Sequence, residues 1–395
     1  MNEQRVIPGQ AADSRHGTQR LVAPARTLAR IKPMLANMGI TRCLDITGLD
    51  CLGIPVFCAT RPHSPVLQIS GGKGMEPDQA RVAALMASIE LYHAETPEPQ
   101  RLRRASAARL AAEGARPLHP EALSEALGNH YSDRRQLYWT EGRDLISGGV
   151  VQVPASAVYF CEPALCATST NGLASGNHPV EASLHALYEL IERDAVSRLS
   201  VDGKPRIREA VRVVDMRTVD EPLLLELHQR IRAADSELVL MAVPGPLPVH
   251  TFWAVLLNRA PFSAMSTLNP GYGCHSDPTS AAAVAITEAA QARAICIHGS
   301  REDIMDKPVY RARNTREEAA YRDFDALRPN ARWADVREAV SAPRGDLFQV
   351  HQALLDAMAQ AGLGPVYSFD LSKPRFGLPV IKLIAPALRF NRAVL

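Results

Sequence analysis

Residues 171–195 read NGLASGNHPVEASLHALYELIERDA, and the interpretation of the whole chain starts from this stretch. Its apolar residues recur every three to four positions, which predicts a helix over Pro179–Leu199. At about 100° per residue, four ionisable side chains fall on one arc of that helix. They are Glu181, His185, Glu189 and Glu192. Small residues precede the helix and would let a ligand approach the backbone at its N-terminus.

Three carboxylates on one helix face repel each other, and each such pair destabilises a helix by about a few tenths of a kcal/mol. A solvated surface is the first interpretation of this face. However, a solvated acidic face normally carries compensating cations, and here Arg193 and Arg198 lie off the arc. Clustered carboxylates that face inward are what Mg²⁺ requires, since Mg²⁺ takes oxygen ligands and is often shared with substrate phosphates. The functional interpretation is therefore a site for a nucleotide with Mg²⁺.

Two further helices, predicted over Pro77–Ala94 and Thr279–His298, each carry a carboxylate among small residues, Glu90 and Glu288 respectively. Taken alone, each is interpreted as a surface residue. The Gly-rich segment Ser70–Gly74 is interpreted as a loop, and it lacks the GxxxxGK[ST] spacing of a P-loop. Spacing alone predicts a magnesium–nucleotide site and does not identify a reaction.

Composition excludes several classes of protein. The chain has 395 residues, 46% of them hydrophobic, and its 44 basic residues exceed the 42 acidic ones by only two. A broad basic face for nucleic acid would usually show a larger excess. The uncharged stretch Leu238–Asn258 is broken by prolines, which predicts two strands joined by a turn and no membrane span. Seven cysteines without a CxxC pair or a signal peptide predict reduced thiols and a cytoplasmic location.

Helices and strands alternate along the chain, but without the regular period of a doubly wound sheet. This pattern predicts the α/β class, with several mixed layers of sheet and helix in one large domain over residues 19–395. The polar residues 1–18 predict a flexible N-terminal tail.

Together these segments resemble the YcaO family, from about Arg20 to Pro386. The resemblance is carried by ITRCLDITGLDCLGIPVF, by SGGKG followed by ARVAALMASIELYHAE, by the 171–195 stretch, by GYGCHSDPTSAAAVAITEAAQAR and by GLPVIKLIAP. It implies an α/β fold of the family's own that binds ATP with Mg²⁺ through an acidic cluster. It also implies a reaction in which ATP phosphorylates a peptide amide oxygen after a nucleophile has added to the carbonyl, giving azolines or thioamides.

The resemblance assigns roles residue by residue. It implies that five carboxylates bind metal: Glu90, Glu181, Glu189, Glu192 and Glu288. It implies that five further residues contact the nucleotide: Arg20, Thr27, Ala174, Asn177 and Arg193. His185 lies on the same arc and is either an assistant to the metal site or a hydrogen-bonded, partly protonated neighbour.

Two positions depart from the family pattern. Ala87 stands where a second Glu is usual, three residues before Glu90, and Val284 stands where an Arg is usual, four residues before Glu288. One metal ligand and one phosphate-binding cation are thus missing. Either the site binds nucleotide with fewer ligands, or the chain is a scaffold subunit that does not hydrolyse ATP.

The opening TQRLVAPARTLARIKPMLANMGITRCLDITGLDCLGIPV and the ending SIELYHAE resemble the branch that works with a TfuA-type partner. That branch implies thioamide formation in a ribosomally made peptide or protein, with a TfuA-like partner and a sulfur donor. An azoline-forming cyclodehydratase is the alternative activity. An unrelated α/β protein with fortuitous acidic helices also stays open, as does a homodimer.

Overall fold

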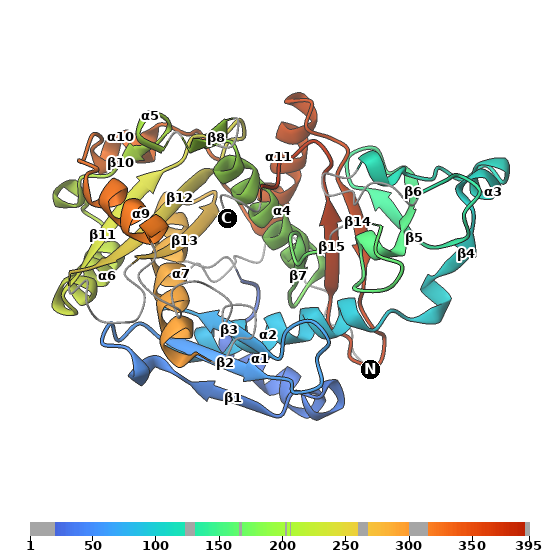
Figure 1. Ribbon diagram of the computed structural model, residues 1–395, viewed down its shortest axis with the longest axis horizontal. Coiled ribbons are helices and arrows are strands. Elements are labelled where there is room, and N and C mark those ends of the chain that lie inside the picture. The colour runs from blue at the N-terminus through green and yellow to red at the C-terminus, as the bar shows by residue number, and fades with distance from the viewer. Residues whose placement is uncertain are drawn as a thin grey trace.

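The computed structural model describes residues 20–122, 131–165, 168–201, 204–205, 207–259, 268–299 and 315–391. The predicted tail over residues 1–18 lies outside the described residues. Three long helices organise the described part: α2 (Pro77–Glu95), α4 (Pro179–Ser197) and α7 (Pro278–His298). In Figure 1, α2 runs below, α4 crosses the middle diagonally, and α7 lies against the sheet on the left. All three were predicted to within two residues of their observed ends.

An antiparallel sheet lies between two of these helices. Its strands, in spatial order, are β1 (Arg42–Asp45), β2 (Val56–Thr60) and β3 (Ile69–Lys73). One face packs on α2 through Phe57 and Ala59, and the other packs on α7 through Cys58 and Ile69. The Gly-rich segment predicted as a loop is therefore mostly strand β3. Its glycines let the strand approach both helices closely. A side chain at Gly71 would collide with α7, and one at Gly72 would collide with α2.

A second antiparallel sheet carries α7 on one face. Its strands, in order, are β10 (Arg212–Val213), β11 (Ser236–Ala242), β12 (His250–Asn258) and β13 (Leu268–His275). The predicted pair of strands within Leu238–Asn258 is confirmed as β11 and β12. Helices α6 (Pro222–Ala233) and α10 (Trp333–Glu338) share the face with α7, while α9 (Thr315–Asp325) and the end of α4 cover the other.

The third sheet is antiparallel and carries helices on both faces, and its last strand belongs to the segment before α4. Its strands, in order, are β4 (Arg103–Ala105), β5 (Leu137–Asp144), β14 (Tyr367–Asp370), β15 (Val380–Ile384) and β7 (Leu173–Ser175), with β6 (Val150–Pro154) also paired to β5. Helix α2 packs on one face, and α4 with α11 (Leu347–Gln360) packs on the other. The α/β class with several mixed layers is thus confirmed.

Short elements complete the described chain. Besides several 3-10 helical turns, they are α1 (Pro24–Ile31), α3 (Ala107–Ala112), α5 (Ile207–Ala210) and the hairpin β8 (Ser200–Val201) with β9 (Lys204–Pro205). Part of the local sequence pattern is overridden by long-range pairing, since β7 forms within a small-residue stretch by pairing with β15.

Among the described residues, α7 is the one helix that is long and apolar enough to cross a membrane by length and composition. Of its apolar window, 67% is buried inside the protein, as in a core helix. The predicted cytoplasmic location stays a prediction.

The contact between β13 and α7 yields a stability test. A Cβ atom at Gly271 would lie 2.2 Å from the backbone nitrogen of Ala289 and 2.3 Å from the carbonyl oxygen of Ala285. Because neither backbone atom can yield cheaply, we expect Gly271→Ala to lower the free energy of unfolding by about 3 kcal/mol. Urea unfolding measures this. Gly48→Ala, which has nothing within 4 Å of its Cβ, is the control, and equal losses in both variants would contradict the packing argument.

Candidate functional site

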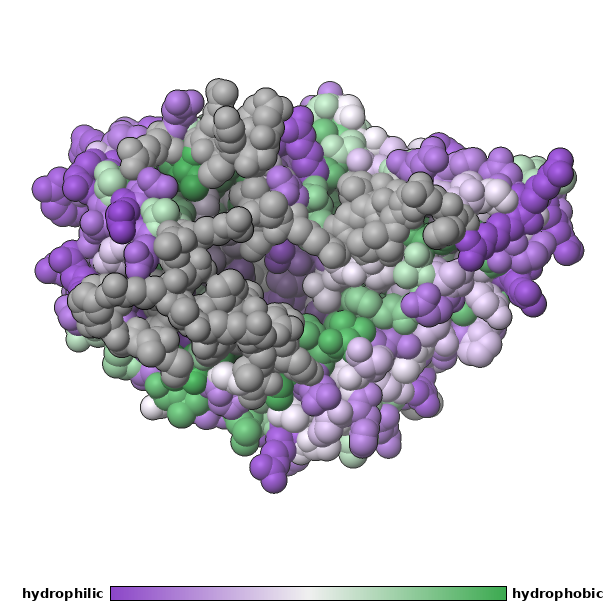
Figure 2. Space-filling model, viewed as in Figure 1, coloured by the Kyte–Doolittle hydropathy of each residue, from purple (hydrophilic) through white to green (hydrophobic). Residues whose placement is uncertain are grey.

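The three long helices meet around two adjoining cavities of about 600 and 330 Å³. They share one wall, and its lining residues include Arg20, Lys73, Ala87, Glu90, Glu181, His185, Val284 and Gln291. In the space-filling view, the surface is hollowed near the middle of the molecule, and hydrophilic residues lie inside the hollow (Figure 2). Nearly all of the ionisable residues line the larger cavity, whereas methionine, valine and alanine side chains of α2 line much of the smaller one.

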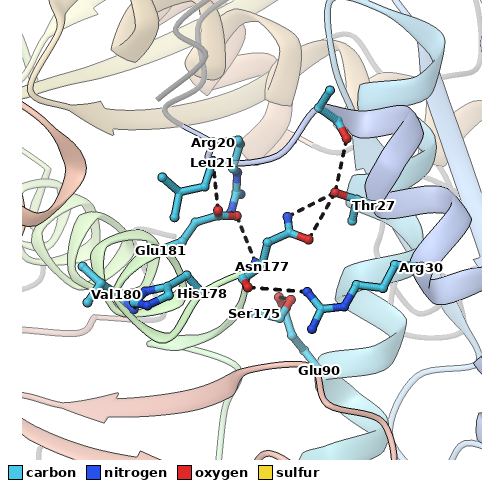
Figure 3. A network of polar contacts seen from close by, with 11 residues as sticks. Arg20, Leu21, Thr27, Arg30, Glu90, Ser175, Asn177, His178, Val180 and Glu181 are labelled. Carbon is cyan, nitrogen blue, oxygen red and sulfur yellow. Dashed lines mark hydrogen bonds and ion pairs between the residues drawn. The ribbon is translucent and has the colours of Figure 1, made fainter. Parts of the chain in front are cut away.

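The predicted arc of α4 faces these cavities. Glu181 is 2% exposed and Glu192 is 7% exposed, so the solvated-surface interpretation of this face is wrong. Glu181 accepts hydrogen bonds from Arg20 Nη1 (3.1 Å), the backbone N–H of Leu21 (3.1 Å) and the backbone N–H of Asn177 (3.3 Å). Figure 3 shows how these donors surround one carboxylate. Glu181 therefore ties the segment before α1 to the start of α4.

Glu90 reaches the same wall from α2. Its Oε1 accepts a hydrogen bond of 2.5 Å from the hydroxyl of Ser175, which ends strand β7 (Figure 3). Burial raises the pKa of Glu90 to about 7, and the nearby Glu189 adds to the rise. In the metal-free protein this carboxyl group is thus poised to lose its proton near neutral pH.

Glu189 and Glu192 lie one turn apart in the larger cavity, with Arg193 between them. Arg193 Nη2 is 3.6 Å from Glu189 Oε1, and Arg193 Nε is 3.6 Å from Glu192 Oε1. The backbone N–H of Gly172 donates to Glu189 Oε2 at 3.1 Å. Burial raises the pKa of Glu189, although Arg193 opposes the rise. Burial and the charge of Glu288 raise the pKa of Glu192 to about 8.

Glu288 reaches the cavity from α7 and forms an ion pair with Lys73 of β3. Burial alone would raise its pKa, but Lys73 and Arg193 outweigh burial and hold the pKa below its usual range. Lys73 is therefore part of the site. Its segment was judged by whether it has the spacing of a P-loop, and that criterion was the wrong one. Its signal in the sequence is the Gly-Gly pair before it, which lets β3 carry it between α2 and α7.

The donor set fits Mg²⁺ shared with a nucleotide better than a closed protein cage. Within the described ranges, no three His, Cys, Asp or Glu side chains converge on a point that could hold a metal ion. Mg²⁺ usually keeps several waters and takes only one or two carboxylates together with substrate phosphates. Moreover, Arg193 Nε is buried, and its nearest carboxylate oxygen in the ion pair with Glu192, at 3.6 Å, is too far for a hydrogen bond within the described part of the protein. An oxyanion would satisfy that donor.

Four of the five residues predicted to contact nucleotide line the cavities. Thr27 and Asn177 line the smaller one, where the Asn177 amide donates to Thr27 Oγ1 at 3.1 Å (Figure 3). Arg20 lies at the shared wall, and Arg193 lies in the larger cavity. Ala174 is fully buried in the core against β15 and is not among the residues that line either cavity.

Both departures from the family pattern lie at the shared wall. Ala87 is one turn before Glu90 on α2, Val284 is one turn before Glu288 on α7, and both line the two cavities. Relative to the pattern that the resemblance implies, one negative and one positive charge are absent from this wall. The net charge of the wall is therefore the same as with the usual Glu and Arg.

His185 is more than a third exposed, and it faces the cavities. Removal of the ring from bulk water, together with the charges of Arg20 and Lys73, lowers the pKa of His185 to about 3. The lowered pKa favours a neutral ring over the partly protonated neighbour that the sequence analysis left open. Ser175 and Gly172, which donate hydrogen bonds to Glu90 and Glu189, were missed because the stretch before α4 was considered only as small residues that would let a ligand approach.

An α/β fold with carboxylates and cations along one cavity wall is the arrangement of a metal–nucleotide-binding protein. The family model described as YcaO cyclodehydratase, ATP- and Mg²⁺-binding, matches residues 71–389. The chain therefore belongs to the YcaO family, whose members are ATP-dependent peptide-modifying enzymes. The predicted cofactors, ATP and Mg²⁺, are those of the family.

The chain is also similar to individual proteins. An uncharacterised protein from the region 3′ of tfuA in Rhizobium leguminosarum bv. trifolii is 31% identical over 380 residues, which cover 94% of this chain and 89% of the relative. That location is consistent with the TfuA-associated branch.

Two solved structures share the fold. YcaO from Methanopyrus kandleri, bound with AMPPCP and Mg²⁺, matches with a TM-score of 0.76 at 24% identity, over 95% of this chain and 94% of that one. A heterocyclase in complex with substrate and cofactor matches with a TM-score of 0.78 at 20% identity, over 97% of this chain and 54% of that one.

The raised pKa values predict how pH affects stability. Glu90 and Glu192 titrate at about 7 and 8 in the folded protein, against an ordinary value of 4.5. The folded state then binds more protons than the unfolded state, so the metal-free protein should lose stability as pH rises from 6.5 to 8.0. Mg²⁺ binds the ionised carboxylates, so its stabilising effect should grow over the same range.

Thermal unfolding at a series of pH values, with and without Mg²⁺, measures both effects. Above pH 6.5 the neutral His185 contributes little, because its ordinary pKa is 6.5. Glu192→Gln is the control and should flatten the metal-free dependence. A Mg²⁺-induced rise in Tm that is equal at pH 6.5 and 8.0 would contradict the prediction.

Proposed function

We propose that this protein uses ATP and Mg²⁺ to activate a peptide backbone amide for thioamide formation. The observation that carries the proposal is the shared wall, where α2, α4 and α7 bring carboxylates together with Arg20, Lys73 and Arg193. Such a set suits a triphosphate and its metal, since the cations match phosphate charge and the carboxylates match metal charge. The relative from the tfuA region supports the thioamide branch over the azoline branch.

In this proposal the two cavities hold different parts of the nucleotide. The smaller cavity has an apolar wall from α2 and the polar pair Thr27 and Asn177, which suit a nucleoside. The triphosphate then extends into the larger cavity, toward Lys73 and Arg193. When bound, Mg²⁺ would neutralise phosphate charge. The residues that would hold it are Glu90, Glu181, Glu189, Glu192 and Glu288. The side chains orient the terminal phosphoryl group and exclude bulk water.

A sulfur nucleophile adds to the amide carbonyl carbon, and the carbonyl oxygen takes the terminal phosphoryl group of ATP. With hydrosulfide-level sulfur as the nucleophile, the C–O bond then breaks, phosphate leaves, the sulfur releases its proton to water, and the C=S bond forms, so that the products are a thioamide, ADP and phosphate. A peptide or protein substrate, a sulfur donor and a TfuA-like partner would be needed. An internal side-chain nucleophile in place of the sulfur donor would give the azoline alternative.

Ala87 and Val284 favour the second candidate, a nucleotide-binding subunit that does not turn ATP over. Their side chains leave the shared wall without one carboxylate and one cation that the family pattern contains. However, Lys73 supplies a cation at Glu288, one turn from Val284 on the same helix. The charge balance of the wall therefore supports nucleotide binding in either case.

The metal role of α4 is tested by Glu189→Gln and Glu192→Gln. Each exchange keeps the side-chain size but removes a charge, so we expect Mg²⁺-dependent binding of AMPPCP to weaken about 100-fold, the scale of losing a charged contact worth about 3 kcal/mol. Calorimetric titration measures the affinity. Glu226→Gln on α6, with a half-exposed side chain, is the matched control. Unchanged affinity in both α4 variants, with a normal circular dichroism spectrum, would refute the metal role.

The two departures are tested by restoring the charged pair. We expect the double variant Ala87→Glu/Val284→Arg to raise ATP turnover by about tenfold or more, because one added cation at a phosphoryl-transfer site is worth at least that much. Phosphate release measures turnover. Val284→Arg alone is the control, since it adds a charge without its partner. Equal turnover in the wild type and the double variant would mean that partners, and not the missing groups, set the rate.

A further inference from the structure

Lys382 is a buried cation on β15 that does not line either cavity, although its charge acts on Glu189 and opposes the rise in the pKa of that carboxyl group. It is 4% exposed. Its Nζ donates to the carbonyl oxygens of Ser169 and Asn171, at 2.6 Å each. Burying an ammonium group is costly unless its surroundings compensate the charge. The contacts of this buried ammonium group therefore indicate what it does in the structure.

The two carbonyls belong to the segment just before β7, and this segment is pressed against β15. Gly172 has a φ of +75°, and a Cβ atom there would lie 2.4 Å from the carbonyl oxygen of Leu383. The backbone N–H of Leu383 in turn donates to the carbonyl oxygen of Gly172 at 2.8 Å. Three carbonyls of this segment, those of Ser169, Asn171 and Gly172, are therefore held by β15, two of them by Lys382.

Holding the carbonyls on one side directs the intervening N–H to the other. The N–H of Gly172 donates to Glu189 Oε2 at 3.1 Å. Glu189 Oε1 is the oxygen that lies 3.6 Å from Arg193 at the cavity. One carboxylate oxygen is thus fixed from behind by the backbone, and the other is turned toward the cavity.

We infer that Lys382 is a positioning residue for Glu189, acting through the Ser169–Gly172 backbone, and this inference rests on the proposed metal role of Glu189. Groups that orient a metal ligand from behind usually contribute about 10- to 100-fold to metal affinity. Without Lys382, two carbonyls lose their donor, the segment relaxes, and the Gly172 N–H leaves Glu189. The carboxylate then spends part of its time turned away from the metal.

The chain supplies a matched control in Lys373. It is also a lysine near the C-terminal end, it is also 4% exposed, and its Nζ also donates to a backbone carbonyl, that of Thr96. It lies over the ring of Tyr92, 5.7 Å from the ring centroid, and it lines neither cavity. Lys373→Met therefore removes a buried lysine of the same kind without touching Glu189.

The test compares wild type, Lys382→Met, Lys382→Arg and Lys373→Met. Calorimetric titration gives the Kd of AMPPCP at saturating and at zero Mg²⁺, and hydrogen exchange reports on the peptide that contains Gly172. In Lys382→Met we expect the Mg²⁺-dependent affinity to fall about 10- to 100-fold, with faster exchange at Gly172. Lys382→Arg, which keeps the charge and the donors, should recover part of the affinity, and Lys373→Met should match the wild type in both measurements.

Each outcome separates the inference from the proposed function. Wild-type protein that shows no Mg²⁺-dependent binding overturns the proposed function and this inference with it. Wild-type binding with an unchanged Kd in Lys382→Met overturns the inference alone, as does an equal loss in Lys373→Met. Should Lys382→Met fail to fold, Lys382→Gln keeps one donor to the carbonyls, and a wild-type Kd in that variant overturns the inference equally.

Discussion

Five glutamates from three helices lie along one cavity, and their mutual repulsion in a poorly hydrated place is the constraint to which the surrounding structure responds. Each carboxylate has a specific partner. Glu181 is held by Arg20 and two backbone N–H groups, Glu288 by Lys73, and Glu90 by Ser175. The partners come from segments far away in the chain, so the repulsion is balanced only when the whole fold has formed.

Close approach of backbones makes this arrangement possible. Strand β3 lies between α2 and α7, and β13 lies against α7, at distances that admit only glycine at several positions. The long helices carry alanines at the facing positions, so α7 packs with almost no side-chain volume between it and the sheet. A rigid frame of this kind fixes where a helix presents its carboxylates, to the precision that a metal–phosphate site requires.

The helical period of α4 was sufficient to predict which of its residues share a face, because all four lie within three turns of one helix. Glu90 and Glu288 could be assigned only by family resemblance, since nothing in the local sequence tells that α2 and α7 converge on α4. The partners of the carboxylates were beyond sequence reasoning altogether. Ser175 is 85 residues from Glu90, Lys73 is 215 residues from Glu288, and both contacts depend on strand pairing and strand burial that the local pattern does not reveal.

The need to balance charge along the cavity wall also bears on Ala87 and Val284. Without the Glu that the resemblance implies, an Arg at position 284 would lack a partner, and without that Arg a Glu at position 87 would lack one; an unpaired charge that is partly removed from water is costly. Losing both keeps the wall neutral relative to the family pattern, and Lys73 still pairs with Glu288. All five carboxylates that the resemblance implied lie along one cavity, and Arg20, Lys73 and Arg193 lie along it as well. Carboxylates and cations side by side in this way suit a ligand that carries both phosphate and metal charge.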